Sequence, residues 1–337
     1  MHIGFQIRIL YDMVMNMEKT QMLGMPNVGL GNLTEYQLLV LFGNYHSLSL
    51  VEGTDLMPNS IVDANERLLY PAYYMTHIQV PVNNFIENYT LWEQARVSVD
   101  VKCFGANLLD SHYTFGACSK EDKIDKEPIV MDSNSLFVVD ATIDKSVNRT
   151  SAIPKPEQIA KLEKMKKVPD SLKKFKSIRN EGFQLDEGTL LGNYKFHYLI
   201  VENRDVSINH GVIFAKFTEI MDMCESEFLC DGKNIGLPKE LIPFIHIVDR
   251  ETFYYSNCFA GDIIECNMTI NLEKCEDRHL TGKKNEFTVY WMYETFELYN
   301  EKARNLLLLA KAKKLICLPI TARELEEDIS RIIHRKK

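Results

Sequence analysis

A glycine-rich stretch that runs into a helix start is the first place where residue types in this sequence could do chemistry. The stretch reads GMPNVGLGNLTEYQLLVLFGNYH, and its helical pattern begins near Asn32. Backbone N–H groups at a helix start are unpaired and lie at the positive end of the helix dipole, so they can stabilise a developing oxyanion. Gly29 and Gly31 would let this backbone approach a ligand closely. Helix capping by Asn32 or Thr34, with Glu35 in the first turn, explains part of the same pattern.

A tyrosine-rich stretch, LYPAYYMTHIQV, supplies a second group of candidates. A tyrosine can donate a hydrogen bond to a carboxylate or thioester oxygen, and with a lowered pKa it can accept an acyl group. In a strand, Tyr73 and Tyr74 point to opposite faces, so at most one of them can face a substrate. His77 could act as a base from the same strand. Sheet packing is the alternative explanation, because aromatic residues favour strands.

The stretch INHGVIFAKF places three more candidates at a second predicted helix start: Asn209, His210 and Gly211. A side chain near a helix start can orient a water molecule, so His210 is a candidate catalytic residue. Asn257, in YYSNCFAGD, could line the same cleft. Cys258 and His210 could also form a nucleophilic pair, although cysteine and histidine occur together too commonly for this pattern to be specific.

The elements that must position these residues occur twice along the chain. Apolar, β-rich runs predict a first strand, a helix and four further strands at 3–15, 32–50, 70–80, 93–103, 108–117 and 135–143. The second half repeats this order, with the helix over VIFAKFTEIMDMCESEFL and strands at 194–208, 244–256, 262–272, 286–299 and 306–318. We therefore predict an N-terminal domain over 1–143, a connector with a short helix over 144–193, and a C-terminal domain over 194–337.

The repeated order predicts an α+β fold of the double hot-dog type. A long helix after the first strand of an antiparallel sheet is the hot-dog plan, in which the sheet wraps around the helix. Two copies in one chain would give tandem hot-dog domains whose sheets join edge to edge. Val97, Val99 and Val101 alternate with polar residues, as expected for a strand with one buried face. The alternative is an unrelated α+β fold whose halves resemble each other by chance.

Composition limits the classes of partner. The formal net charge is −8, which argues against nucleic acid as a partner. No apolar run reaches the length of a membrane span, so we expect a soluble, cytoplasmic protein without a membrane partner. The eight cysteines form no CxxC pair and the nine histidines show no metal-ligand spacing, so we predict free thiols and no metal. The basic segment 155–179 could dock CoA phosphates or an acidic carrier protein, or could simply be a solvated helix face.

Three stretches, GMPNVGLGNLTEYQLL, LYPAYYMTHIQVP and YYSNCFAGDIIEC, resemble the bifunctional methylmalonyl-CoA decarboxylase/acyltransferases of polyketide biosynthesis, the LnmK-like proteins. The resemblance implies an enzyme without a metal or organic cofactor. It would release CO2 from methylmalonyl-CoA and transfer the propionyl group to an acyl carrier protein. It also implies a catalytic tyrosine, with Tyr74 as first choice and Tyr73 as second. The helix start would then stabilise the enolate oxygen of the thioester.

Two other functions fit the same fold. An acyl-CoA or acyl-carrier thioesterase or dehydratase would use Glu35 or His210, because a helix carboxylate is the general base in hot-dog thioesterases. A non-catalytic module would bind an acyl carrier protein without turnover and would tolerate changes at Tyr73 and Tyr74. The fold alone cannot choose among these functions. A homodimer through the sheet edges is compatible with all three.

Overall fold

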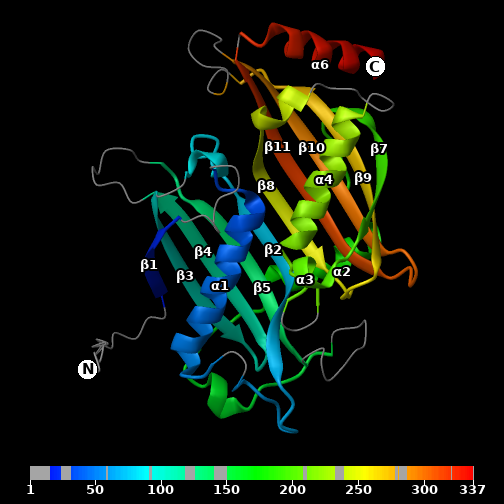
Figure 1. Ribbon diagram of the computed structural model, residues 1–337. Coiled ribbons are helices and arrows are strands. Elements are labelled where there is room, and N and C mark those ends of the chain that lie inside the picture. Colours follow the sequence, from blue (N-terminus) through cyan, green and yellow to red (C-terminus); the bar gives the residue numbers. More distant parts are fainter. Residues whose placement is uncertain are drawn as a thin grey trace.

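One large sheet, curved around two long helices, organises the molecule (Figure 1). The computed structural model describes residues 16–23, 32–57, 60–90, 93–117, 126–139, 150–207, 211–231, 239–277, 280, 287–319 and 321–336. The sheet has eleven strands in the order β1-β3-β4-β5-β2-β8-β11-β10-β9-β7, with β6 pairing with β3 outside this path. All neighbours along this path are antiparallel.

Each half of the chain supplies five strands and one central helix. The N-terminal half contains β1 (Asn16–Met22), α1 (Glu35–Thr54), β2 (Leu69–Gln79), β3 (Gln94–Phe104), β4 (Leu108–Ala117) and β5 (Ile129–Val139). The C-terminal half contains β7 (Thr189–Leu199), α4 (Lys216–Cys230), β8 (Ile245–Tyr254), β9 (Ile263–Lys274), β10 (Phe287–Asn300) and β11 (Leu306–Pro319). Shorter elements are η3 (Ile86–Asn88), η4 (Pro156–Ile159), β6 (Glu163–Lys164), α2 (Asp170–Glu181), α3 (Glu202–Asp205), η5 (Lys239–Phe244) and α6 (Arg323–Lys336).

The two halves share one topology and meet along a single strand pair. The order β1-β3-β4-β5-β2 in the first half corresponds to β7-β9-β10-β11-β8 in the second. The strands β2 and β8 pair from Met75↔Phe253 to Gln79↔Asp249, so the two sheets are joined edge to edge. This arrangement confirms the predicted double hot dog.

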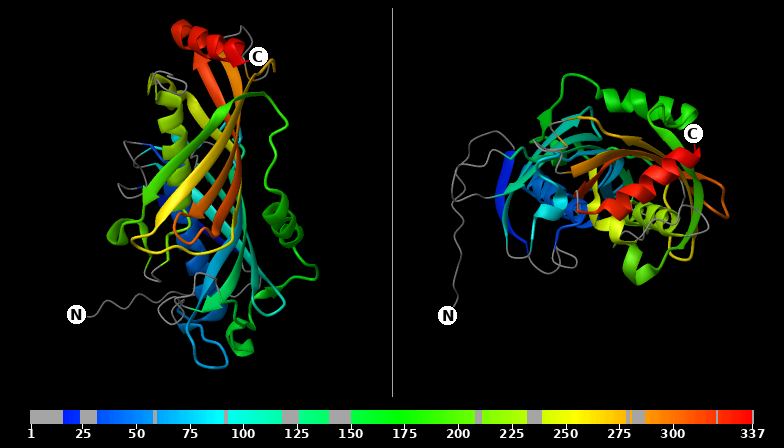
Figure 2. Two further views of the ribbon diagram at one scale, coloured as in Figure 1. Left: turned by 90° about the vertical axis from the view of Figure 1, so that its right-hand side faces the viewer. Right: turned by 90° about the horizontal axis from the view of Figure 1, so that it is seen from above.

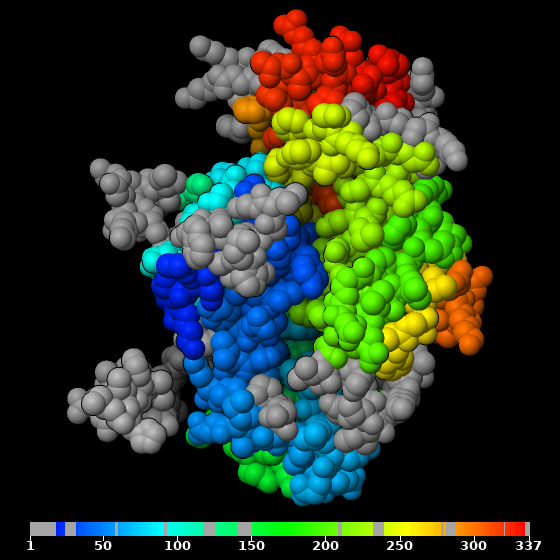
Figure 3. All heavy atoms as spheres, in the orientation of Figure 1, coloured from blue at the N-terminus to red at the C-terminus, as the bar shows by residue number. Residues whose placement is uncertain are grey.

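Hydrophobic periodicity explains which face of the sheet holds the helices. Val97, Val99 and Val101 of β3 are fully buried, and they alternate with residues that are exposed or half-buried. Leu38 and Phe42 of α1 are also fully buried in the same core cluster. Burying each such side chain stabilises the fold by roughly 1.5–3 kcal/mol. The concave face therefore closes over α1 and α4, which lie side by side in Figures 1 and 3.

The connector helix α2 covers the opposite, convex face of the sheet (Figure 2). Leu172, Phe175 and Ile178 face the sheet at intervals of three residues, one side of a helix, and pack against Tyr74 of β2 and Phe253 of β8. Because these two strands belong to different halves, α2 covers the seam between the halves.

Several element bounds differ from the sequence-based expectation. The strand expected at 3–15 lies in residues 1–15, outside the described part of the chain, and the first described strand is β1. The first strand of the second half begins at Thr189, inside the stretch expected as connector. The strand expected at 135–143 begins earlier, at Ile129. The C-terminal helix α6 was not expected. Within the described residues, no helix is long and apolar enough to cross a membrane.

Candidate active site between the two halves

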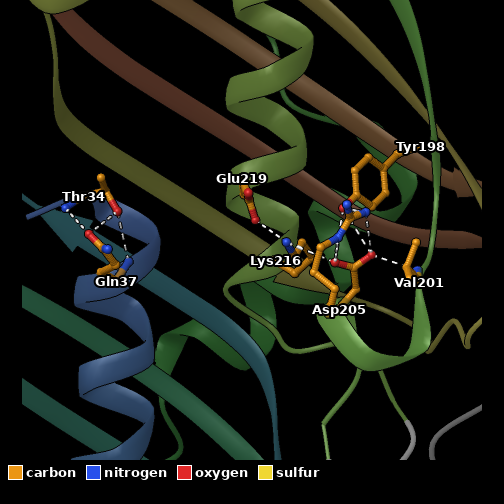
Figure 4. A network of polar contacts seen from close by, with 8 residues as sticks. Thr34, Gln37, Tyr198, Val201, Asp205, Lys216 and Glu219 are labelled. Atoms are coloured by element: carbon orange, nitrogen blue, oxygen red, sulfur yellow. Dashed lines mark hydrogen bonds and ion pairs between the residues drawn. The ribbon is translucent and has the colours of Figure 1, made fainter. Parts of the chain in front are cut away.

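The start of α1 is closed by a complete capping box. The Thr34 hydroxyl accepts a hydrogen bond from the Gln37 backbone N–H at 3.3 Å, and the Gln37 side chain accepts one from the Thr34 N–H at 3.0 Å (Figure 4). The side chain of Thr34 is therefore engaged in capping. Asn32 is exposed and forms an isolated β-bridge with Thr90. The predicted ligand contacts of Gly29 and Gly31 fall outside the described residues.

The first residue of α1 is buried against the other half of the protein. Glu35 is 7% exposed, and its Oε1 lies 3.2 Å from Nε of Arg250 on β8, which is 2% exposed. A surface acid in a first helical turn would only complement the helix dipole. Glu35 instead faces inward, where a charged side chain is costly unless a partner compensates it. The ion pair joins the N-terminal helix to the C-terminal sheet.

Arg250 and Glu35 belong to a larger buried network of charges. Arg250 Nη2 donates to Asp222 Oδ1 on α4 at 2.8 Å. Lys314 Nζ of β11 lies 3.1 Å from the same Asp222 oxygen, also pairs with Glu225, and lies 3.6 Å from Glu294 Oε2 on β10. All six side chains come from the interface between α1, α4 and the sheet.

Burial and the neighbouring charges determine the protonation of the carboxyl groups in this network. Burial raises the pKa of Glu35 to about 7, although Arg250 opposes this effect. Burial also raises the pKa of Glu294. Burial would raise the pKa of Asp222 too, but the charges of Lys314 and Arg250 outweigh it and lower that pKa. Glu35 can therefore bind or release a proton near neutral pH, as a general base must.

A pocket of about 280 Å³ opens beside Glu35, between elements of both halves. Its lining residues are Thr34, Glu35, Glu87, Asp222, Glu225, Ser226, Ile242, Pro243, Ile245, Ile247 and Lys314. The lining therefore combines apolar side chains with carboxylates and one lysine. This volume is just below the usual range of about 300–1,000 Å³ for ligand pockets, so the pocket has room for no more than a short acyl chain.

The two candidate tyrosines lie at a β-bulge in β2 and point to opposite faces of the sheet. Tyr73 pairs with Ser135 and Met75 pairs with Asn134, which leaves Tyr74 as the extra residue. Tyr73 packs in the main core on the concave face, whereas Tyr74 and Met75 both pack in the cluster beneath α2. The prediction that the two tyrosines face opposite sides of the sheet is therefore confirmed.

Tyr73 lies in a buried cluster of hydroxyl and imidazole groups. Its hydroxyl is 3.3 Å from that of Tyr113, which in turn is 2.8 Å from Nδ1 of His46 on α1. The ring of Phe214, just before α4, packs on Tyr73 at a centroid distance of 4.4 Å. Burial and Tyr113 raise the pKa of Tyr73, and burial lowers the pKa of His46 to about 4. The cluster is therefore neutral at physiological pH.

Our first choice of catalytic tyrosine, Tyr74, does not fit this arrangement. Its hydroxyl lies 3.4 Å from Ser171 Oγ of α2, and its ring meets Phe175 edge-on at 5.4 Å. Burial raises its pKa to about 12. This side chain lies on the convex face, on the other side of the sheet from Glu35. Of the two tyrosines, Tyr73 is the one that faces the central helices.

His77 also lies on the convex face, away from the pocket. Its Nε2 pairs with Asp249 Oδ2 of β8 at 2.8 Å, so it contributes a polar link across the seam between the halves. Burial alone would lower the pKa of His77, but the hydrogen bond and charge of Asp249 reverse the effect and raise it. The position fits a structural role better than the predicted role as a base.

The second helix start is only partly described. Asn209 and His210 lie outside the described residues, and with them the predicted Cys258–His210 pair. Gly211 is buried, and a Cβ added there would lie 4.0 Å from Asn257 Oδ1, so these two predicted residues are neighbours. Cys258 is 1% exposed, and its carbonyl accepts from the Val212 N–H at 3.3 Å.

A second buried ion network fixes the approach to α4. Asp205 accepts from the Val201 N–H at 2.9 Å and from Tyr198, and it pairs with Lys216 at 3.1 Å (Figure 4). Lys216 in turn pairs with Glu219. Burial would raise the pKa of Asp205, but hydrogen bonds from Arg204, Val201 and Lys216 lower it to about 2. These contacts hold the chain on both sides of residues 208–210.

Sequence reasoning missed the buried network around Glu35, although the sequence carries a signal for two of its members. Glu294 interrupts the apolar run FTVYWMYETFELY, and Lys314 interrupts LLLLAKAKKLICL. A charged residue at the inward phase of a buried strand needs an ionic partner. Among the described residues, no group of three or more His, Cys, Asp or Glu side chains could hold a metal ion.

Comparison with known proteins places the fold but not the family. No family model and no curated protein matches this sequence. A protein from Lactobacillus plantarum, provisionally identified as an oleoyl thioesterase, is 10% identical with a TM-score of 0.60, covering 91% of this chain and 98% of its own. The 12:0-ACP thioesterase of Umbellularia californica is 13% identical with a TM-score of 0.55, covering 91% and 99%. An acyl-ACP thioesterase from Bacteroides thetaiotaomicron is 13% identical with a TM-score of 0.50, covering 89% and 98%.

These similarities establish a double hot-dog fold across about nine-tenths of the chain, since each match covers the structure nearly end to end. At such low identity they do not establish an activity. The resemblance to methylmalonyl-CoA decarboxylase/acyltransferases stays a prediction.

Proposed function

We propose that this protein hydrolyses acyl thioesters of CoA or of an acyl carrier protein, with Glu35 as the general base. The observation that carries this proposal is a buried carboxylate with a pKa of about 7, on the first turn of a central helix and lining a pocket between the halves. The structurally similar thioesterases support the substrate class. This was the alternative considered from the sequence, and it now fits better than decarboxylation.

The hydrolytic step assigns a task to each part of the site. Glu35 takes a proton from a water molecule as that water attacks the thioester carbonyl carbon. The carbon–sulfur bond then breaks, and the leaving thiolate takes up the proton from Glu35, which restores the carboxylate. Arg250 favours the ionised form of Glu35 while burial opposes it, and this balance keeps the carboxylate able to accept a proton near pH 7.

The sharpest test compares Glu35→Gln with a matched control on the same helix. Release of free CoA from a panel of short acyl-CoA thioesters is measured for the wild type and both variants. Glu52, an exposed residue of α1 that pairs with Lys19, supplies the control Glu52→Gln. We expect Glu35→Gln to reduce kcat by roughly a hundredfold or more, as for loss of a general base, and Glu52→Gln to behave like the wild type. Equal activity of both variants would refute the role of Glu35.

Decarboxylation of methylmalonyl-CoA with transfer of the propionyl group to a carrier protein is a second candidate. The observation that favours it is the inward position of Tyr73 beside α1, where a protonated hydroxyl can donate to a thioester oxygen. Its raised pKa argues against an acyl-tyrosine intermediate, because the phenolate is disfavoured. Propionyl-CoA or propionyl-carrier formed from methylmalonyl-CoA, and lost in Tyr73→Phe, would establish this function in place of hydrolysis.

A further inference from the structure

One carboxylate of the buried network contacts both of its cations. Oδ1 of Asp222, on α4, accepts a hydrogen bond from Arg250 Nη2 at 2.8 Å and another from Lys314 Nζ at 3.1 Å. Among the ion pairs of the described residues, Glu35 contacts only Arg250, and Glu225 contacts only Lys314. Asp222 therefore links the partner of Glu35 to the rest of the network.

The guanidinium group of Arg250 is held between two carboxylates that belong to different helices. Its Nε faces Glu35 at 3.2 Å, and its Nη2 donates to Asp222. Arg250 is 2% exposed, and its Cζ lies 5.9 Å from the centroid of the Phe296 ring. A guanidinium group presents its N–H donors in a rigid planar fork, so a contact that fixes one donor also orients the others. The contact with Asp222 thereby determines how Arg250 meets Glu35.

The charge of Asp222 also acts on Glu35 directly. Burial is the main cause of the raised pKa of Glu35, and four charged groups from four elements modify it: Arg250 of β8, Asp222 of α4, Lys314 of β11 and Glu87 of η3. The two cations lower this pKa and the two carboxylates raise it. Burial would raise the pKa of Asp222, but Lys314 and Arg250 lower it, so Asp222 stays ionised while Glu35 titrates. The negative charge of Asp222 therefore opposes the ionisation of Glu35.

We propose that Asp222 is a positioning residue for the reaction, which orients Arg250 against Glu35 and sets the pH range in which Glu35 accepts a proton. This inference rests on the proposed thioester hydrolysis. It makes α4 of the C-terminal half a determinant of how the base on α1 works. Asp222 lines the same pocket, but it acts through Arg250 and Glu35 rather than on the thioester.

The test is the pH dependence of kcat/KM for butyryl-CoA in the wild type and in Asp222→Asn. Asparagine keeps an oxygen that can accept from Arg250 but loses the charge. Because the ionised base is the active form, kcat/KM rises with pH through the pKa of Glu35. Without the opposing charge, we expect this midpoint to move to lower pH by about one unit. A midpoint that stays in place or moves to higher pH would overturn the inference.

Two further variants separate orientation from charge. Asp222→Glu keeps the carboxylate but lengthens the side chain, so the midpoint should stay near that of the wild type while kcat falls roughly tenfold or more. This variant also serves if Asp222→Asn does not fold, and a wild-type kcat in Asp222→Glu would refute the positioning role. Asp170→Asn makes the same loss of charge at a side chain of α2 that is 96% exposed, and it should leave the midpoint and kcat unchanged.

A second measurement does not need turnover. The carboxyl carbon of Glu35 is followed by carbon-13 NMR in protein labelled at glutamate, and its signal is assigned by its absence from Glu35→Gln. Asp222→Asn should move the midpoint of this signal to lower pH. If no acyl-CoA is hydrolysed, the proposed function fails, and the NMR midpoint still decides the role of Asp222. An unchanged or higher midpoint in Asp222→Asn would contradict that role even if hydrolysis is established.

Discussion

Replacing Glu35 by Gln should change the pH dependence of stability as well as activity. The pKa of Glu35 is about 7 in the folded protein, against 4.5 for the unperturbed group. Between these two pH values the folded state retains a proton that the unfolded state has lost. Stability must therefore fall as pH rises through this window and level off above about pH 7. A glutamine carries no titrating proton, so the stability of the variant does not show this decrease with pH.

The size of the effect follows from the shift in pKa. One pKa unit corresponds to about 1.4 kcal/mol, so the shift of Glu35 corresponds to roughly 3 kcal/mol. Relative to the wild type, Glu35→Gln should gain about this amount of stability on going from about pH 4.5 to about pH 8. The same substitution should reduce activity by roughly a hundredfold or more. A gain in stability together with a loss of activity is expected when burial keeps a catalytic base in a state that is reactive but lowers the stability of the fold.

The assay is urea unfolding of the wild type, Glu35→Gln and Glu52→Gln at both pH values. Comparing each variant with the wild type at each pH removes the contributions of the titrating groups that the substitution does not affect. Glu52, an exposed residue of the same helix, supplies the matched control for the change from glutamate to glutamine. If the stability difference for Glu35→Gln depended on pH no more than that for Glu52→Gln, Glu35 would not have a raised pKa and the assignment of the base would lose its basis.

Three further variants test other parts of the structure. Tyr74→Phe loses one long hydrogen bond beneath α2, so it should reduce the free energy of denaturant unfolding by about 1 kcal/mol or less and leave thioester hydrolysis intact. A large loss of activity would mean that the substrate lies on the convex face. Phe175→Ala removes ring contacts that join α2 to the seam, and it should reduce the midpoint of urea unfolding by an amount equivalent to about 3 kcal/mol. An unchanged midpoint would show that α2 adds no stability to the seam. Asp205→Asn leaves Lys216 without its buried partner and should reduce the free energy of unfolding by roughly 3–5 kcal/mol at neutral pH. The cost should be smaller below about pH 2, where the wild-type carboxylate is itself protonated, and an equal cost at both pH values would contradict the low pKa of Asp205.

Much of the fold could be predicted because its signals are local and repeated. Alternation of Val97, Val99 and Val101 identified a strand with one buried face, and the repeated order of strands and helices identified the two halves. Edge-to-edge joining followed from that plan. The C-terminal helix α6 fell outside the repeated pattern and was missed.

The site was harder to predict because it depends on long-range register. Glu35 stood out as a first-turn acid, but its partner Arg250 lies in the other half, and single-sequence patterns do not reveal which strand positions face a given helix end. Alternation along β2 predicts that Tyr73 and Tyr74 face opposite sides of the sheet, but it does not reveal which of them faces the central helices, and the structure gives that position to Tyr73. The charged residues within apolar strands were the available signal for the network.

The most direct test of the proposed hydrolysis is to follow butyryl-CoA and methylmalonyl-CoA, each incubated with the protein in water labelled with heavy oxygen. Mass spectrometry of the products identifies the bond that breaks and the source of the new oxygen. We predict free CoA together with an acid that carries one heavy oxygen atom, with the rate greatly reduced in Glu35→Gln. Propionyl-CoA or a propionyl-protein adduct from methylmalonyl-CoA, without labelled acid, would contradict hydrolysis and indicate decarboxylation and acyl transfer.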